Sequence, residues 1–130
     1  MLSGQTPPRV WNTRRSEKQR RLASVPVQGK VLPTDDLVAM LEKLIAPGDR
    51  VVLEGNNQKQ ADFLSRALAE VNPQKVHDLH MIMPSVGRSE HLDIFEKGIA
   101  RKLDFSFSGT QSLRISQLLE DGLLEIGAIH

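Results

Sequence analysis

The sequence predicts an α/β fold with a parallel sheet, built in layers from repeated strand–loop–helix units. Three observations predict it. Short apolar runs at residues 51–53, 77–83, 103–107 and 123–129 have the length and composition of strands. Segments with apolar residues at helical spacing lie between these runs, and turn-forming residues separate one segment from the next. Strands that alternate with helices in this order join as parallel neighbours in one sheet.

A first helix is expected over residues 34–45. Thr34 is a suitable N-cap, and the two aspartates that follow it favour the positive end of the helix dipole. Apolar residues from Leu37 to Ile45 fall on one face of this helix. The sequence Ala-Pro-Gly-Asp at residues 46–49 then ends the helix and turns the chain.

The next segment predicts a βαβ unit. Residues 51–53 are wholly apolar, which is typical of a strand covered on both faces. The polar stretch from Glu54 to Gln58 interrupts this strand, a helix follows over residues 61–71, and a second strand spans residues 77–83. Two parallel strands joined through a helix imply a right-handed crossover.

The pattern then repeats. Ser89 can begin a helix that Gly98 ends, and residues 103–107 alternate as a strand does. One or two further helical turns around Ile115 stop at Asp121 and Gly122, before the strand at residues 123–129. This last strand has the composition of an interior strand. We therefore expect a basic N-terminal arm (residues 1–32) and the N-terminal part of an α/β domain (residues 33–130) that belongs to a longer enzyme.

Composition restricts the class of protein. Hydrophobic residues make up 39% and charged residues 25%, and no apolar run approaches the roughly 18 to 20 residues that span a bilayer. The chain contains no cysteine, which removes disulfides and a cysteine nucleophile. We expect a cytoplasmic protein with no membrane partner.

The charge is unevenly distributed along the chain. Residues 1–30 hold seven Lys and Arg against one Glu, a net charge of +6, whereas residues 31–130 hold ten against fifteen, a net charge of −5. A basic arm of this kind binds an acidic face of its own protein, a partner or an anionic cofactor. Aromatic residues do not alternate with the basic ones to stack bases, so we do not expect a nucleic-acid partner.

Three segments follow predicted strands and carry glycine, amide or hydroxyl residues: residues 55–58, 84–88 and 108–111. In open parallel sheets, ligands bind beyond the carboxyl ends of the strands, and helix N-termini there favour anionic or carbonyl oxygens. The candidate binding residues are Gly55, Asn56, Asn57, Gln58, Gly109 and Thr110, and Glu54 is the candidate catalytic carboxylate. The alternative is that these are ordinary turns in which glycine only relieves backbone strain.

Several specific motifs are absent. The sequence contains neither the glycine-rich dinucleotide fingerprint nor the phosphate loop of nucleotide triphosphatases. His77 and His80, three apart in a predicted strand, would face opposite ways and make a poor metal pair, so no metal site is expected. Ser85 and Ser108 have no histidine and aspartate partners at an informative spacing, and His91 is expected to face solvent.

Four stretches resemble one known family, the malonate decarboxylase alpha subunit: residues 49–64 (DRVVLEGNNQKQADFL), 11–15 (WNTRR), 80–84 (HMIMP) and 103–109 (LDFSFSG). That family belongs to the coenzyme A transferase superfamily. The resemblance covers nearly the whole chain and implies a layered coenzyme A transferase-like fold, incomplete in this chain. Family proteins are several times longer, so this chain would be an N-terminal piece without turnover of its own.

The resemblance also implies an activity. The family transfers an acyl carrier protein from acetate to malonate, forming malonyl carrier and free acetate, and companion subunits decarboxylate the malonyl group. The carrier bears a phosphoribosyl-dephospho-coenzyme A group. Coenzyme A transferases use a glutamate that forms acyl anhydride and glutamyl thioester intermediates, and it usually comes from a later part of the chain. Gly55–Gln58 stands where the glycine-rich transferase motif is expected, and its backbone is the candidate for thioester contact.

Two other functions remain open at this point. A sugar-phosphate isomerase or deaminase of similar architecture would hold its phosphate at residues 108–111 and the helix start beyond them. A non-catalytic interaction module would instead use its basic arm to bind a partner subunit.

Overall fold

A computed structural model describes residues 10–23, 36–54, 61–106 and 108–129. Four strands form one sheet in the order β1-β2-β3-β4, and each neighbouring pair is parallel. Their bounds are Arg50–Val52 for β1, Leu79–Ile82 for β2, Ala100–Phe105 for β3 and Glu125–Ile129 for β4. The predicted fold class and parallel sheet are thus confirmed.

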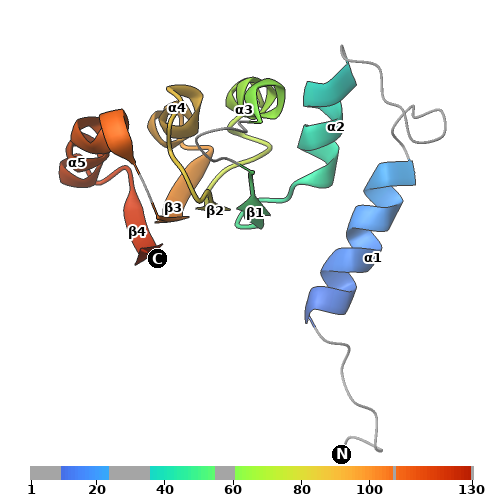
Figure 1. Cartoon of the computed structure of the whole chain (residues 1–130). Coiled ribbons are helices and arrows are strands. Elements are labelled where there is room, and N and C mark those ends of the chain that lie inside the picture. The colour runs from blue at the N-terminus through green and yellow to red at the C-terminus, as the bar shows by residue number, and fades with distance from the viewer. Residues whose placement is uncertain (1–9, 24–35, 55–60, 107, 130) are drawn as a thin grey trace, which may run out of the picture.

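The connecting helices lie on one face of this sheet (Figure 1). Helices α3 (Asp62–Ala69), α4 (Glu90–Glu96) and α5 (Ser112–Glu120) each connect two successive strands, and a short 3₁₀ helix, η2 (Gly109–Gln111), precedes α5. Helix α2 (Leu37–Leu44) lies next to α3 in the same row. Crossovers of one hand that advance in one direction across a sheet place their helices on the same side.

The core lies between the sheet and this row of helices. Along β2, and along β3 from Leu103 to Phe105, residues that point toward the helices are buried and their neighbours are not, as the two-residue period of a strand requires. The central strands contribute Leu79, Met81, Leu103 and Phe105 to the core, and the helices contribute Leu68, Leu92, Ile94, Phe95, Ile115 and Leu118.

Within the described residues the opposite face of the sheet carries no helix, so two strands expected to be covered are exposed on that face. Val52 in β1 is 71% exposed, so residues 51–53 do not form a strand covered on both faces. Strand β4 is an edge strand of the described sheet, and its Glu125, Gly127 and Ile129 are exposed. The apolar character of residues 123–129 comes from Leu124 and Ile126, which pack toward the core.

The helix boundaries follow the predicted signals only in part. Gly98 and Gly122 have φ angles of +78° and +73° and directly follow the ends of α4 and α5, as expected for left-handed glycines that end a helix. Thr34, the predicted cap, lies outside the described residues, and α2 begins after Asp36 without a side-chain cap hydrogen bond. None of the described helices is long and apolar enough to cross a membrane.

Helix α1 (Val10–Ala23) lies within the basic arm and was not predicted as a helix. Its Lys18 reaches the body of the chain, where Nζ donates to the Leu44 carbonyl at 2.7 Å and pairs with the Asp49 carboxylate. Asp49 also accepts a hydrogen bond of 2.9 Å from the Ala46 N–H, which fixes the carboxylate in the turn after α2. At least one cation of the arm thus binds an acidic group of the same chain.

Replacing Lys18 with methionine should loosen α1 from the body. The loss in the free energy of unfolding should stay within about 1 kcal/mol, because Lys18 is partly exposed to solvent. The more sensitive measurement is the rate of trypsin cleavage after Arg14 and Arg15, which should rise severalfold. Lys75→Met, which removes a long 3.9 Å contact with Glu42, is the matched control. Unchanged cleavage at both arginines would show that Lys18 does not hold the helix.

Candidate active-site edge

The segments that follow β1, β2 and β3 lie side by side at the carboxyl edge of the sheet. Hydrogen bonds between backbone groups continue past the strands: Leu53 N donates to Ile82 O at 3.1 Å, and Met83 N donates to Asp104 O at 3.0 Å. Ser106 N donates to Pro84 O at 3.0 Å. Consecutive parallel strands place their carboxyl ends together. The described parts of the predicted ligand-binding segments therefore do meet at one edge.

Glu54 is exposed and lies at this edge, just beyond the end of β1. Gly55, Asn56, Asn57 and Gln58 lie outside the described residues. The residues on either side of them are joined, because Ala61 N donates to Glu54 O at 3.3 Å. The structure thus fixes where this segment leaves β1 and where it enters α3.

Gly109 and Thr110 lie at the same edge, after β3, and both are exposed in η2. Gly109 has a φ angle of +50°, a backbone conformation that glycine adopts without strain. Two serines build the turn: Ser112 Oγ donates to the Gly109 carbonyl at 2.8 Å and lies 2.7 Å from Ser108 Oγ. Ser108 therefore has a structural contact here and, among the described residues, no histidine partner.

His91 does not face solvent, which corrects the sequence-based expectation. Its side chain is only 1% exposed, and Nε2 lies 3.2 Å from Oγ of Ser65, which is itself 2% exposed. On the other side of the ring, Nδ1 lies 3.3 Å from the backbone nitrogen of Arg88, which donates to it. This buried pair joins α3 to α4.

The hydrogen bonds set the direction of proton donation in this pair. Because Nδ1 accepts from Arg88, the neutral ring carries its proton on Nε2 and donates to Ser65 Oγ. Ser65 in turn donates to the Ala61 carbonyl at 2.7 Å. A histidine that donates to a serine cannot remove the serine's proton. The pair is therefore not arranged as the nucleophile and base of a serine hydrolase.

Burial lowers the pKa of His91, and the positive charge of Arg88 lowers it further, while Glu90 and Asp62 act in the opposite direction. A histidine whose folded-state pKa lies below the unfolded value of about 6.5 binds fewer protons when folded. Its contribution to stability is therefore complete above that value and is lost as the pH falls below it.

His91→Gln should remove this acid sensitivity, because glutamine does not titrate. We expect the stability advantage of the wild-type chain over the variant to shrink as the pH falls from 7 to 5, measured by urea unfolding at each pH. Glu90, Asp62 and Arg88 are present in both proteins, so their titration cancels in the difference. If the difference in stability between the two proteins stays constant from pH 7 to 5, His91 does not cause this acid sensitivity.

His77 and His80 contact different aspartate side chains. Only His80 lies in β2, where its Nε2 is 2.9 Å from Oδ1 of Asp104 on β3. His77 lies before the strand, and Nδ1 is 2.8 Å from Oδ2 of Asp78. Across the described ranges, no three histidine, aspartate or glutamate side chains gather as metal ligands would.

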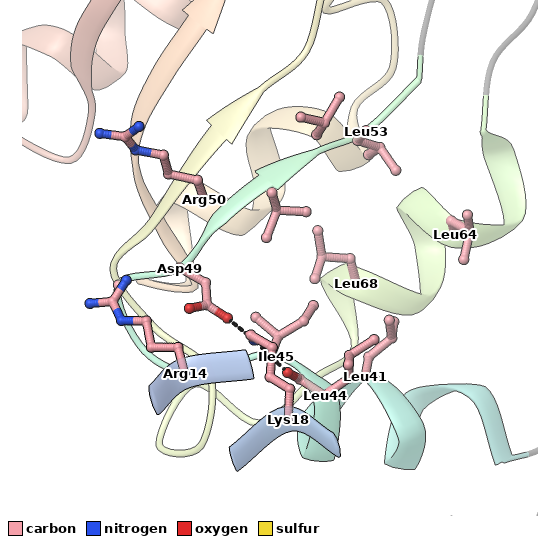
Figure 2. A pocket seen from close by; sticks show the side chains of 13 residues that line it. Arg14, Lys18, Leu41, Leu44, Ile45, Asp49, Arg50, Leu53, Leu64 and Leu68 are labelled. Atoms are coloured by element: carbon pink, nitrogen blue, oxygen red, sulfur yellow. Dashed lines mark hydrogen bonds and ion pairs between the residues drawn. The ribbon is translucent and has the colours of Figure 1, made fainter. Parts of the chain in front are cut away.

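A hollow of about 810 Å³ runs along β1, from Gly48 before the strand to Leu53 after it (Figure 2). Within the described sheet β1 pairs only with β2, so this flank of the strand has no neighbouring strand. Arg14 lies beside the Lys18–Asp49 pair at the rim, and the side chain of Arg50 extends away from the apolar walls. The apolar walls come from Leu41, Leu44, Ile45, Leu53, Leu64 and Leu68. The sequence did not indicate this hollow, because it depends on which strand lies at the edge.

Similarity to known proteins covers almost the whole chain. The family model described as malonate decarboxylase, alpha subunit, transporter matches residues 10–130. An acetyl-S-ACP:malonate ACP transferase of Malonomonas rubra is 43% identical over 125 residues, which are 94% of this chain and 23% of that protein.

Two solved structures share the fold and most of the sequence. A malonate decarboxylase alpha subunit from Acinetobacter baumannii is 72% identical, with a TM-score of 0.88 over 93% of this chain. A Pseudomonas malonate decarboxylase hetero-tetramer in complex with malonate is 78% identical, with a TM-score of 0.88 over 95% of this chain. In each case this chain spans 23% of the other chain's length. The chain belongs to the malonate decarboxylase alpha subunit family.

Proposed function

We propose that this sequence is the front part of an acyl-carrier-protein transferase that converts acetyl carrier and malonate into malonyl carrier and acetate. The observation that carries the proposal is the family match over residues 10–130. The relative from Malonomonas rubra is named for this reaction, and the Pseudomonas structure was determined with malonate. The same match favours a transferase over a sugar-phosphate isomerase.

The carboxyl edge of the sheet is the proposed site of contact with the carrier's thioester. Glu54 and Thr110 are exposed there, beyond the ends of β1 and β3. We propose that backbone N–H groups of Gly55–Gln58, Gly109 and Thr110 contact the thioester or its phosphate groups. Such donors stabilise the oxyanion that develops when a thioester is attacked. The catalytic nucleophile would come from beyond this chain, and Glu54 remains the candidate carboxylate within it.

The proposed partners follow from the reaction. They are an acyl carrier protein that bears a phosphoribosyl-dephospho-coenzyme A group, and the subunits that decarboxylate malonyl carrier. The Pseudomonas relative was solved as a hetero-tetramer, which supports a complex of several subunits. We place this complex in the cytoplasm.

A direct assay tests the activity. The full-length protein that contains this sequence should convert acetyl carrier and isotopically labelled malonate into labelled malonyl carrier, with release of one acetate per transfer. The 130-residue chain should show no turnover, because it lacks the later segments. Transfer by the short chain, or its absence from the full-length protein with active partners, would contradict the proposal.

A further inference from the structure

Two connections leave the carboxyl edge, and the buried Ser65–His91 pair links the described residues at which they enter α3 and α4. One leads from Glu54 to the start of α3, and the other leads from β2 through Arg88 into α4. The start of α3 and the turn before α4 therefore depend on the same side chains for their position. The reaction proposed above needs donors held in place at this edge, since a misplacement of about 1 Å can lower a rate about a hundredfold.

The contacts form a continuous path between the two connections. Glu54 O accepts from Ala61 N at 3.3 Å, and Ala61 O accepts from Ser65 Oγ at 2.7 Å. Ser65 Oγ is 3.2 Å from Nε2 of His91, as described above.

The path then returns to its starting helix. His91 Nδ1 accepts from Arg88 N at 3.3 Å, and Arg88 Nη1 lies 3.0 Å from Oδ1 of Asp62, the first residue of α3. Arg88 also contacts the Glu90 carboxylate with its Nε at 3.2 Å. A closed path of this kind fixes the start of α3 relative to the turn before α4.

An apolar side chain would fill this buried position without the free-energy cost of removing two ring nitrogens from water. A buried polar group stabilises a fold only when its hydrogen bonds are made, and an imidazole at this position must satisfy both ring nitrogens. Histidine provides a donor and an acceptor on opposite sides of one rigid ring. That geometry suits a side chain that links Ser65 on one helix to the backbone before the next.

We propose that His91, acting through Ser65 and Arg88, is a positioning residue that holds the start of α3 and the turn before α4 at the carboxyl edge in the geometry needed for carrier transfer. This inference rests on the proposed function. His91 itself is buried and does not contact the substrate. Its effect should appear in kcat, because groups held in place beside the reacting thioester act mainly on the transition state.

The test uses the full-length protein in its complex, with labelled malonate and acetyl carrier as substrates. His91→Phe fills the position but makes neither hydrogen bond, and kcat should fall at least about tenfold while KM for malonate changes little. His91→Gln places an amide N–H near the position of Nε2 and should restore most of that loss. Ser65→Ala should resemble His91→Phe, and the double variant should be no worse than either one, because both act through the same contact.

Val76→Ala is the control for a loss of stability alone. Val76 is fully buried before β2, at the opposite rim of the sheet, so this variant should lower the melting temperature and leave kcat of the folded enzyme unchanged. If His91→Phe loses no more kcat than Val76→Ala at equal folded fraction, or if His91→Gln is as impaired as His91→Phe, the inference is wrong. An inactive wild-type complex would instead overturn the proposed function together with the inference.

Discussion

Leu103→Ala should lower the free energy of unfolding of the 130-residue chain by about 2 to 5 kcal/mol, the range for removing a large aliphatic side chain from a packed core. Leu103 is fully buried in β3, between β2 and β4 and beneath the helices. Alanine would leave a space that neighbouring strands, each fixed by its own ladder of hydrogen bonds, cannot readily close.

Urea unfolding followed by circular dichroism measures this loss, and Arg101→Ala provides the matched control on the same strand. Arg101 is exposed and makes a 3.3 Å contact with Glu125, so its replacement should cost no more than about 1 kcal/mol. Equal losses for the two variants would contradict the placement of the core between sheet and helices.

Gly127→Ala should also destabilise the chain, by about 1 to 3 kcal/mol, as overpacking generally does. A Cβ atom at this position would overlap Oδ1 of Asp104 on the neighbouring strand. The Asp104 side chain is not free to move aside, because Oδ1 accepts from Ala128 N at 2.8 Å and lies 2.9 Å from Nε2 of His80. The contact with His80 lowers the pKa of Asp104 against the opposing effect of burial, and Ala128 N–H and Lys102 lower it further. The carboxylate is therefore charged and held when the protein is folded.

Asp104→Ala, made alone and together with Gly127→Ala, tests whether the loss of stability comes from the overlap with the Asp104 side chain. Removing the carboxylate leaves only Lys102 Cε, at 2.9 Å, among the close atoms that the new Cβ would meet. The lysine side chain is flexible and can move aside, so the double variant should be about as stable as Asp104→Ala alone. Urea unfolding of all four proteins forms a double-mutant cycle. Additive losses would show that Gly127 is needed for a reason other than the space it leaves for Asp104.

The order of strands and helices could be predicted from the sequence because the apolar runs, the helical periodicity and the turn residues all indicate the same elements. Apolar runs of strand length alternate with apolar faces of helical period, and glycines end α4 and α5 where the periodicity stops. The sequence did not predict in the same way which face of each strand is covered by helices. Val52 is as apolar as a core residue, yet it is exposed, because it points to the face of the described sheet that the helices do not cover.

The burial of His91 was missed for a similar reason, although a signal was present. Ile94 and Phe95 follow His91 by three and four residues, which places all three on one face of a helix, and both are buried. Ser65 has the same relation to Leu68 and Ala69 on α3. A polar residue at a core position of its helix, with a second one on a neighbouring helix, indicates a buried hydrogen-bonded pair.

Helix α1 was missed because the arm lacks an apolar stripe. Seven of its 14 residues are arginine, lysine, glutamine or glutamate, which are good helix formers with no face that must be buried. What locates the helix is the contact of Lys18 with Asp49 and the Leu44 carbonyl, which joins groups 26 to 31 residues apart in sequence. Contacts at this separation cannot be inferred from local periodicity.

Photo-crosslinking tests most directly whether the loaded carrier meets the carboxyl edge of the sheet. A photoreactive amino acid would be introduced into the full-length protein at Glu54 or Thr110, and at Gln74 on the opposite rim as a matched exposed position. Illumination with acetyl carrier should give crosslinks to the prosthetic group from positions 54 and 110 and none from position 74. Crosslinks from position 74 alone would put the reacting thioester at the other end of the strands and contradict the proposed site.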